Sequence, residues 1–159
     1  MAGELERRKF TTEEGDHLTL LNVFLAFQQN GRSSAKWCAQ HRLNFKALSR
    51  AVSIRQQLSK YLKRFELPIK SCEDDGTAIR KCLAAGYFRN AAKVQTDGTY
   101  KSIPDAITLH AHPSSVLFTR VPPTGYVIFH EVVETTKRFI RDITVVEPVR
   151  LLAGPSLSR

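Results

Sequence analysis

Apolar residues in the first half of the chain recur at the spacing of an α-helix. The longest such pattern lies between Asn44 and Pro68, where apolar positions step by three and four, as one face of an amphipathic helix requires. Its members are Ala47, Ala51, Ile54, Leu58, Tyr61, Leu62 and Phe65. Asn44 is a good N-cap, and a helix cannot run through Pro68. The pattern therefore predicts a long helix that begins after Asn44 and ends before Pro68.

Three shorter helices are predicted around it. The first runs from Asp16, as its N-cap, to about Gln29, and its apolar residues cover more than half of the circumference, so we expect it to be largely buried. The second carries Trp37 and Cys38 after a cap at Ser33 or Ser34. The third spans Thr77 to Gly86, and we expect Cys82 and Leu83 to lie on its buried side.

The second half of the chain changes to short, β-rich segments. They are Ala91–Gln95, Tyr100–Ile103, Ile107–Ala111, Tyr126–Glu134 and Phe139–Val146. Asp97-Gly98 between the first two is a strong hairpin signal, and Pro113 with the serines after it interrupts the series after the third. Five strands in this arrangement fit a small barrel of the oligonucleotide-binding (OB) kind, with a five-stranded sandwich as the alternative. The predicted fold class is α+β, a helical bundle segment followed by a five-stranded OB-fold-like β-barrel.

Positive charge is concentrated in one segment. Residues 32–70 contain ten basic residues and one acid, so this segment accounts for the net charge of +9 of the whole 159-residue chain. On the long helix, donors follow one another about one turn apart, namely Arg42, Lys46, Arg50, Ser53, Gln57, Lys60 and Arg64. Such a row suits a phosphate backbone, although a solvated helix face without a ligand is the other interpretation.

The sequence lacks the motifs of several enzyme classes. It contains no phosphate-binding Gly-Lys-Ser/Thr loop, no dinucleotide fingerprint and no Gly-x-Ser-x-Gly elbow. Its apolar runs are too short to span a bilayer, and three cysteines without zinc-site spacing suggest reduced thiols. His110, His112, His130 and Glu131 could form a metal or acid/base cluster, or be ordinary strand histidines. We predict neither a catalytic nor a metal site in this chain, and no membrane partner.

A series of short motifs in fixed order resembles a known family. Residues Glu14–Val23 read EGDHLTLLNV, residues 112–117 read HPSSVL, and the turn Thr135-Thr136-Lys137 is followed by Arg141-Asp142-Ile143-Thr144. Between them stand Trp37-Cys38, Asn44, Lys46-Ala47-Leu48, Ile54–Leu58, Ile79–Leu83, Gly86-Tyr87-Phe88 and Asn90-Ala91-Ala92. From about Lys9 to Val146 the chain resembles the C-terminal region of DEAH-box RNA helicases.

The resemblance implies a domain organisation. Residues 1–70 would be the helical end of a helicase-associated (ratchet-like) domain, and residues 71–159 an OB-fold with a leading helix. The ATPase motifs would lie in two upstream RecA-like domains, which would bind ATP and Mg²⁺, so this chain should be inactive alone. Met1–Phe10 reads like the middle of a helix, which suggests a fragment or a truncated gene product. Arg150 stands about where the family has a packed Trp.

The resemblance also implies RNA-binding positions. They are the turn Thr135, Thr136 and Lys137, with His112 and Ser114 nearby, and Lys46 and Arg55 on the long helix. Hydroxyl and ammonium groups suit phosphate and 2′-OH contacts, although an ordinary hairpin turn is the alternative for the first three. Arg55 lies outside the basic row and could instead form a buried ion pair.

Expected partners are single-stranded RNA, the RecA-like domains and G-patch activators. The leading hypothesis is a non-catalytic module that holds single-stranded RNA. The alternative is a docking platform for G-patch-type activators with little RNA contact. Localisation would be nuclear or cytoplasmic, with the nucleus and mRNA splicing preferred by analogy with the family.

Overall fold

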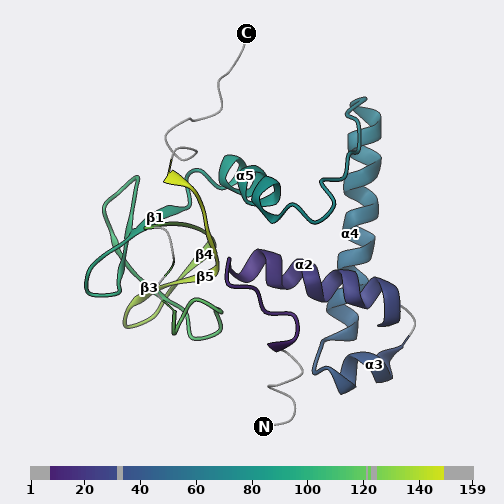
Figure 1. The fold of residues 1–159 in the computed structure, drawn as a ribbon, viewed down its shortest axis with the longest axis horizontal. Helices are drawn as coiled ribbons and strands as arrows, with labels where there is room; N and C mark the ends of the chain where they lie inside the picture. Colours follow the sequence, from purple (N-terminus) through teal and green to yellow (C-terminus); the bar gives the residue numbers. More distant parts are fainter. Residues whose placement is uncertain (1–7, 32–33, 121, 123–124, 149–159) are drawn as a thin grey trace. The chain divides into compact units, whose positions relative to one another are not determined.

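The computed structural model describes residues 8–31, 34–120, 122 and 125–148. These residues form the helices α2 (Asp16–Ala26), α3 (Ala35–Gln40), α4 (Phe45–Arg64) and α5 (Gly76–Gly86), and the π-helical turn η1 (Phe27–Gly31) (Figure 1). The strands are β1 (Ala91–Val94), β2 (Tyr100–Ser102), β3 (Thr108–Ala111), β4 (Tyr126–Glu134) and β5 (Arg138–Val145). The expectations for Ser33, for Arg150 and for residues 1–7 fall outside the described residues.

Two compact units divide the described chain. One contains Leu20–Glu73 and the other contains Thr11–Thr19 together with the chain from Asp74 onward. The division falls within α2, so the first turn of that helix belongs to the unit that holds the barrel.

Side-chain caps fix the starts of α3, α4 and α5. The Asn44 side chain accepts a hydrogen bond from the Ala47 amide at 3.0 Å, which confirms the predicted start of the long helix. Ser34 caps α3 in the same way, through the Trp37 amide at 3.0 Å. Asp75 caps α5, which begins one residue before the predicted Thr77.

The predicted helix from Asp16 to Gln29 is wrong in two respects. Its α-helical part ends at Ala26, and residues Phe27–Gly31 form a π-helical turn. Phe27 is fully buried against the Trp37 and Phe45 rings, with centroids 6.5 and 6.0 Å away. On α2 itself, however, only Asp16 and Leu18 are buried, while Leu20 and Leu25 are about half exposed. An apolar face is buried only where a second element covers it, and within the described residues most apolar side chains of α2 are partly or fully exposed.

Helix α5 packs on the barrel through a narrow stripe. Ala84 is buried there with Ala91, Ile128 and Val146, and Leu83 packs against the same cluster. Cys82 is exposed, so its predicted burial is wrong. Because successive residues differ by about 100° around a helix, the residue before Leu83 faces away from this stripe.

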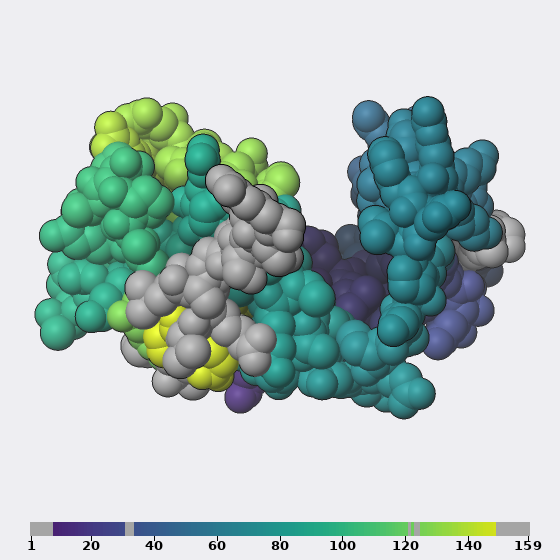
Figure 2. Space-filling model, turned by 90° about the horizontal axis from the view of Figure 1, so that it is seen from above, coloured from purple at the N-terminus to yellow at the C-terminus, as the bar shows by residue number. Residues whose placement is uncertain are grey.

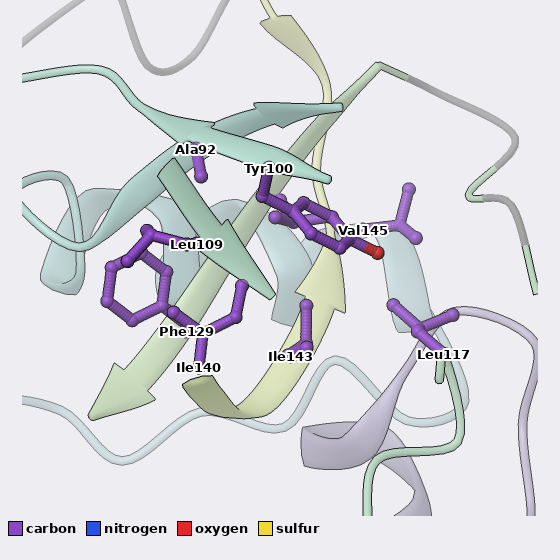
Figure 3. Close-up of a cluster of buried hydrophobic side chains, with 9 residues drawn as sticks. Ala92, Tyr100, Leu109, Leu117, Phe129, Ile140, Ile143 and Val145 are labelled. Carbon is purple, nitrogen blue, oxygen red and sulfur yellow. The ribbon is translucent and has the colours of Figure 1, made fainter. Parts of the chain in front are cut away.

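The five strands close into a barrel in the order β1-β2-β3-β5-β4. The pairs are antiparallel except β3 with β5, and β1 closes the ring by pairing with β4. This closure confirms the OB-like barrel and excludes the five-stranded sandwich. Inward-facing side chains fill the interior, among them Tyr100, Leu109, Phe129, Ile140 and Ile143 (Figure 3).

A left-handed residue interrupts the alternation of β5. Ile140 and Ile143 are both fully buried in the barrel core, although alternate residues of a regular strand share a face and residues three apart do not. Asp142 between them has a φ of 53°. This conformation reverses the alternation of side chains within the strand while the pairing register with β4 stays the same, and both isoleucines point inward.

The segment before α2 is held against β5 by a group of polar contacts, which we call the Asp16 latch. Asp16 is 6% exposed, and its carboxylate accepts three hydrogen bonds, from the Ser115 hydroxyl at 2.6 Å, the Val116 amide at 2.8 Å and the Ile143 amide at 2.7 Å. The prediction that Asp16 is an N-cap is therefore wrong. The first intrahelical bond goes to the Gly15 carbonyl, from the Thr19 amide at 3.2 Å.

The residues on either side of Asp16 complete the latch. Gly15 has a φ of 133°, and a Cβ atom there would lie 2.3 Å from the Ile143 carbonyl oxygen, so glycine is required for this close approach. The His17 amide and ring Nδ1 both contact the Thr144 hydroxyl, at 3.2 and 2.8 Å. Burial is the main influence on the His17 ring and lowers its pKa below 6.5, although the nearby Asp142 and Asp16 carboxylates act in the opposite direction.

Candidate nucleic-acid interface

The turn between β4 and β5 presents a hydroxyl and an ammonium group to solvent. The Thr135 amide and hydroxyl both donate to the Lys137 carbonyl, at 2.9 and 3.3 Å. An ion pair between Arg138 Nε and Glu134 Oε1 at 3.0 Å closes the base of the turn. Within the described residues, the exposed side chains of Thr136 and Lys137 make no hydrogen bond or ion pair. The turn thus uses the Thr135 donors internally and leaves two side chains available for a ligand.

His112 and Ser114 form a second small unit just after β3. His112 Nδ1 lies 2.7 Å from the Ser114 hydroxyl and accepts a hydrogen bond from the Ser114 amide at 3.1 Å. Because an amide N–H can only donate, the neutral imidazole carries its proton on Nε2. The adjacent Ser115 donates to Asp16, so the latch fixes the position of this loop.

The barrel places the Thr135–Lys137 turn and the His112–Ser114 pair on neighbouring strands without bringing them into contact. The His112 amide donates to the Ile140 carbonyl at 3.0 Å, and its ring lies 5.9 Å from the Phe139 ring. In the parallel register of β3 and β5, His112 is level with Arg141. Lys137 precedes Arg141 by four residues, or about 13 Å along an extended chain.

Lys46 and Arg55 are both exposed on α4, which belongs to the compact unit that contains Leu20–Glu73. Nine positions apart on a helix, they project from opposite sides, so one ligand strand cannot contact both along a single face. Lys46 shares its side with Arg50, Lys60 and Arg64, as the predicted basic row requires. Arg42, the first member of that row, precedes α4 and has a φ of 54°, so its predicted place on the helix is wrong. Because Arg55 is exposed, it does not form the buried ion pair that its position outside the row suggested.

The histidines considered for catalysis have other contacts. The His130 ring lies 3.0 Å from the Tyr87 hydroxyl, Glu131 pairs with Arg141 at 3.5 Å, and His110 packs against Phe139. Across the described residues, no three His, Cys, Asp or Glu side chains are grouped so that they could hold a metal ion. In the same part of the chain, no helix combines the length and the apolar character needed to cross a membrane.

The latch was missed by reasoning from the sequence. Its partners lie 99 to 127 residues from Asp16 along the chain. Locally, an aspartate at the start of a helix has the properties of an ordinary cap. The Glu14–His17, His112–Leu117 and Arg141–Thr144 motifs therefore meet at one place in the fold, although their spacing in sequence gives no sign of it.

Comparison with known proteins identifies the barrel. A profile described as oligonucleotide/oligosaccharide-binding (OB)-fold matches residues 79–156. A probable ATP-dependent RNA helicase from Homo sapiens, DHX35, is 46% identical over 145 residues, which is 91% of this chain and 20% of that protein. The DHX35 homologue of Caenorhabditis elegans is 41% identical over 149 residues, covering 89% of this chain and 19% of that protein. The pre-mRNA-splicing factor and ATP-dependent RNA helicase prp22 of Schizosaccharomyces pombe is 36% identical over 144 residues, which is 90% of this chain and 12% of that protein.

The profile and these relatives support the assignment of this chain as a C-terminal OB-fold region of a DEAH-box RNA helicase. This confirms the resemblance seen in the sequence motifs. The chain spans about a fifth of the length of the DHX35 proteins that it matches. In the DEAH-box context, the turn at Thr136 and Lys137 and the exposed basic row of α4 are the candidate RNA contacts of this region.

Proposed function

We propose that this chain is a non-catalytic RNA-binding module of a DEAH-box helicase, which holds single-stranded RNA for an ATP-driven core. The observation that carries the proposal is the OB-fold match together with the helicase relatives over nine-tenths of the chain. ATP and Mg²⁺ would be bound by the RecA-like domains of the parent protein. The compartment would be the nucleus, in line with a relative named as a splicing factor.

The electrostatics of the chain support this proposal. Ten of its 24 Lys and Arg residues fall in residues 32–70, where there is one acid. On α4, Lys46, Arg50, Lys60 and Arg64 are exposed on one side of the helix, where they form a row that can follow a phosphate backbone. Affinity that rests on such contacts falls as salt rises, because binding releases condensed counterions.

A second face of α4 supports the view that the module works inside a larger protein. Ile54, Leu58, Tyr61 and Phe65 follow one another at steps of three and four and are 47%, 56%, 57% and 69% exposed. Figure 2 shows the side chains of α4, in teal-blue at the right, open on the face in view. Soluble proteins rarely leave such apolar patches uncovered. We propose that an upstream segment of the parent helicase covers this stripe.

Coverage of the apolar stripe on α4 can be tested with an apolar dye. A longer form of the protein that includes the upstream domains should bind less 8-anilinonaphthalene-1-sulfonate per molecule than the 159-residue chain. The Leu58→Ser/Phe65→Ser variant of the shorter chain should lose most of its dye fluorescence. Equal dye binding by the longer and shorter forms would contradict the coverage.

RNA binding is tested by charge removal at the proposed contacts. With a labelled single-stranded RNA, Lys137→Ala should reduce the slope of log affinity against log salt by about 0.7, as expected for one lost phosphate contact. Lys46→Ala/Arg50→Ala should reduce it by about twice that amount. Lys70→Ala removes an exposed charge from the segment between α4 and α5 and serves as the matched control, with a smaller change expected.

The same variants separate RNA binding from protein docking. If Thr136→Ala/Lys137→Ala binds RNA as tightly as the wild type, the turn is not an RNA contact. If no variant changes RNA affinity while the chain captures a G-patch peptide, the docking function is the better description.

A further inference from the structure

Three rings gather on the outer face of the barrel, one on β3, one just after β3 and one on β5. On β3, Leu109 and Ala111 pack in the core, so His110 between them faces outward. On β5, Ile140 is buried and the preceding Phe139 faces outward. His110 is directly paired with Phe139, with ring centroids 6.0 Å apart, and the His112 ring centroid lies 5.9 Å from that of Phe139.

These rings are only partly covered. His110, His112 and Phe139 are each of intermediate exposure. Of the acids nearby, Glu131 pairs with Arg141, and Asp97 accepts hydrogen bonds from the Thr99 amide and hydroxyl at 2.9 and 2.7 Å. Partly exposed aromatic faces are suited to stacking with the flat ring of a nucleobase.

Two lysines extend the same outer surface. Lys93 on β1 and Lys101 on β2 are directly opposite each other and both are exposed. Like charges in directly opposed positions destabilise a sheet. The Lys93 ammonium lies 5.8 Å from the Tyr126 ring centroid, and within the described residues Lys101 makes no ion pair. An anionic ligand would relieve this repulsion.

The register connects the lysines to the rings. Lys101 is paired with Thr108, and His110 lies two residues further along the same face of β3. The diagonal separation in such a pair is about 7–8 Å. One nucleotide can bridge this distance, with its phosphate at Lys101 and its base against the rings.

We propose that His110, Phe139 and His112 form a nucleobase-stacking subsite, with Lys101 and Lys93 as its phosphate contacts. The subsite rests on the proposed RNA-binding function and adds to it a means of holding unpaired bases. A duplex, whose bases are stacked on one another, could not use it.

The test compares an oligouridine of about 12 nucleotides with an abasic ribose-phosphate strand of the same length. The wild type should bind the oligouridine about ten-fold more tightly than the abasic strand. His110→Ala and Phe139→Leu should lose most of this preference with an unchanged salt slope, whereas Lys101→Ala should lower the slope by about 0.7 for both strands. His130→Ala removes an exposed ring elsewhere on the barrel and is the matched control, with the preference retained.

The outcomes separate the subsite from the proposed function. If the wild type binds RNA but shows no preference for strands with bases, or if the His110 and Phe139 variants keep it, the subsite is wrong and RNA binding stands. If the wild type binds neither strand at low salt, both proposals are wrong. If Phe139→Leu does not fold, the His110 and His112 ring proton signals of the wild type decide, since a stacked base must shift them and the His130 signal should stay in place.

Discussion

The Asp16 latch predicts a large loss of stability when its carboxylate is removed. Asp16 is 6% exposed, and its three hydrogen-bond donors are a hydroxyl and two amide groups, each of which donates its hydrogen to the carboxylate. In Asp16→Ala the Val116 and Ile143 amides and the Ser115 hydroxyl lose their acceptor inside the folded protein. The perturbation is therefore the creation of unsatisfied buried donors rather than the loss of a helix cap.

The magnitude follows from the number of bonds. Leaving a buried donor unsatisfied costs about 1–3 kcal/mol, so three donors sum to about 3–9 kcal/mol. Because a single substitution rarely costs more than about 5 kcal/mol, we expect Asp16→Ala to lower the free energy of unfolding by about 3–5 kcal/mol. Asp16→Asn can keep an acceptor for Ser115 and Ile143 but turns its amide toward the Val116 N–H, so the expected loss is about 1–3 kcal/mol. A lost N-cap would cost only about 1 kcal/mol.

Urea unfolding followed by circular dichroism measures this difference. With an m-value of about 2 kcal/mol per M, Asp16→Ala should shift the midpoint by about 2 M, and Asp16→Asn by less. Asp105→Ala removes an exposed aspartate from the same unit and should leave the midpoint within experimental error. Amide exchange at Val116 and Ile143 should accelerate in the Asp16 variants. A shift for Asp16→Ala no larger than that of a lost cap would refute the latch.

Three other predictions concern titration and reactivity. Burial lowers the pKa of His17 below 6.5, so below pH 6.5 the unfolded chain binds more protons than the folded one, and stability falls as pH falls. Urea midpoints measured at several pH values should depend less on pH in His17→Gln than in the wild type, and an equal dependence would contradict the burial effect. Burial, with a smaller contribution from the Asp16 charge, raises the pKa of Tyr100 to about 12 from 10.0, so stability should decline as pH rises from 10.0. In a pH titration followed by tyrosinate absorbance, the step near pH 12 should be missing in Tyr100→Phe. Cys72 and Cys82 are exposed and should react with a thiol reagent in the native protein, whereas the buried Cys38 should react only on unfolding. If all three thiols reacted equally fast, the packing around α3 would be contradicted.

Local physics accounts for the elements that the sequence predicted well. The caps at Asn44 and Ser34, and the boundaries of β4, depend on neighbouring residues and on a periodicity that a short window contains. The Asp97-Gly98 turn is similar, because Gly98 adopts the positive φ of 80° that its hairpin requires. These features could be predicted because their causes lie within a few residues of one another.

The features that escaped prediction depend on distant parts of the chain. Asp16 forms its bonds with residues about a hundred positions away, and Asp142 turns left-handed so that two isoleucines can face the same core. The choice of barrel over sandwich depended on β1 pairing with β4 and on the parallel contact of β3 with β5. At the candidate site, the sequence named the turn residues, but the contact of His112 with Phe139 follows only from that parallel register.

The most direct test of the central proposal is the salt dependence of RNA binding by the unmodified chain. Fluorescence anisotropy with a labelled single-stranded RNA and a duplex of the same sequence would be measured at low and at physiological salt. The proposed function predicts measurable affinity for the single strand at low salt, weaker affinity for the duplex, and a steep decline as salt rises. Absence of binding to the single strand at low salt, or equal affinity for both forms, would contradict it.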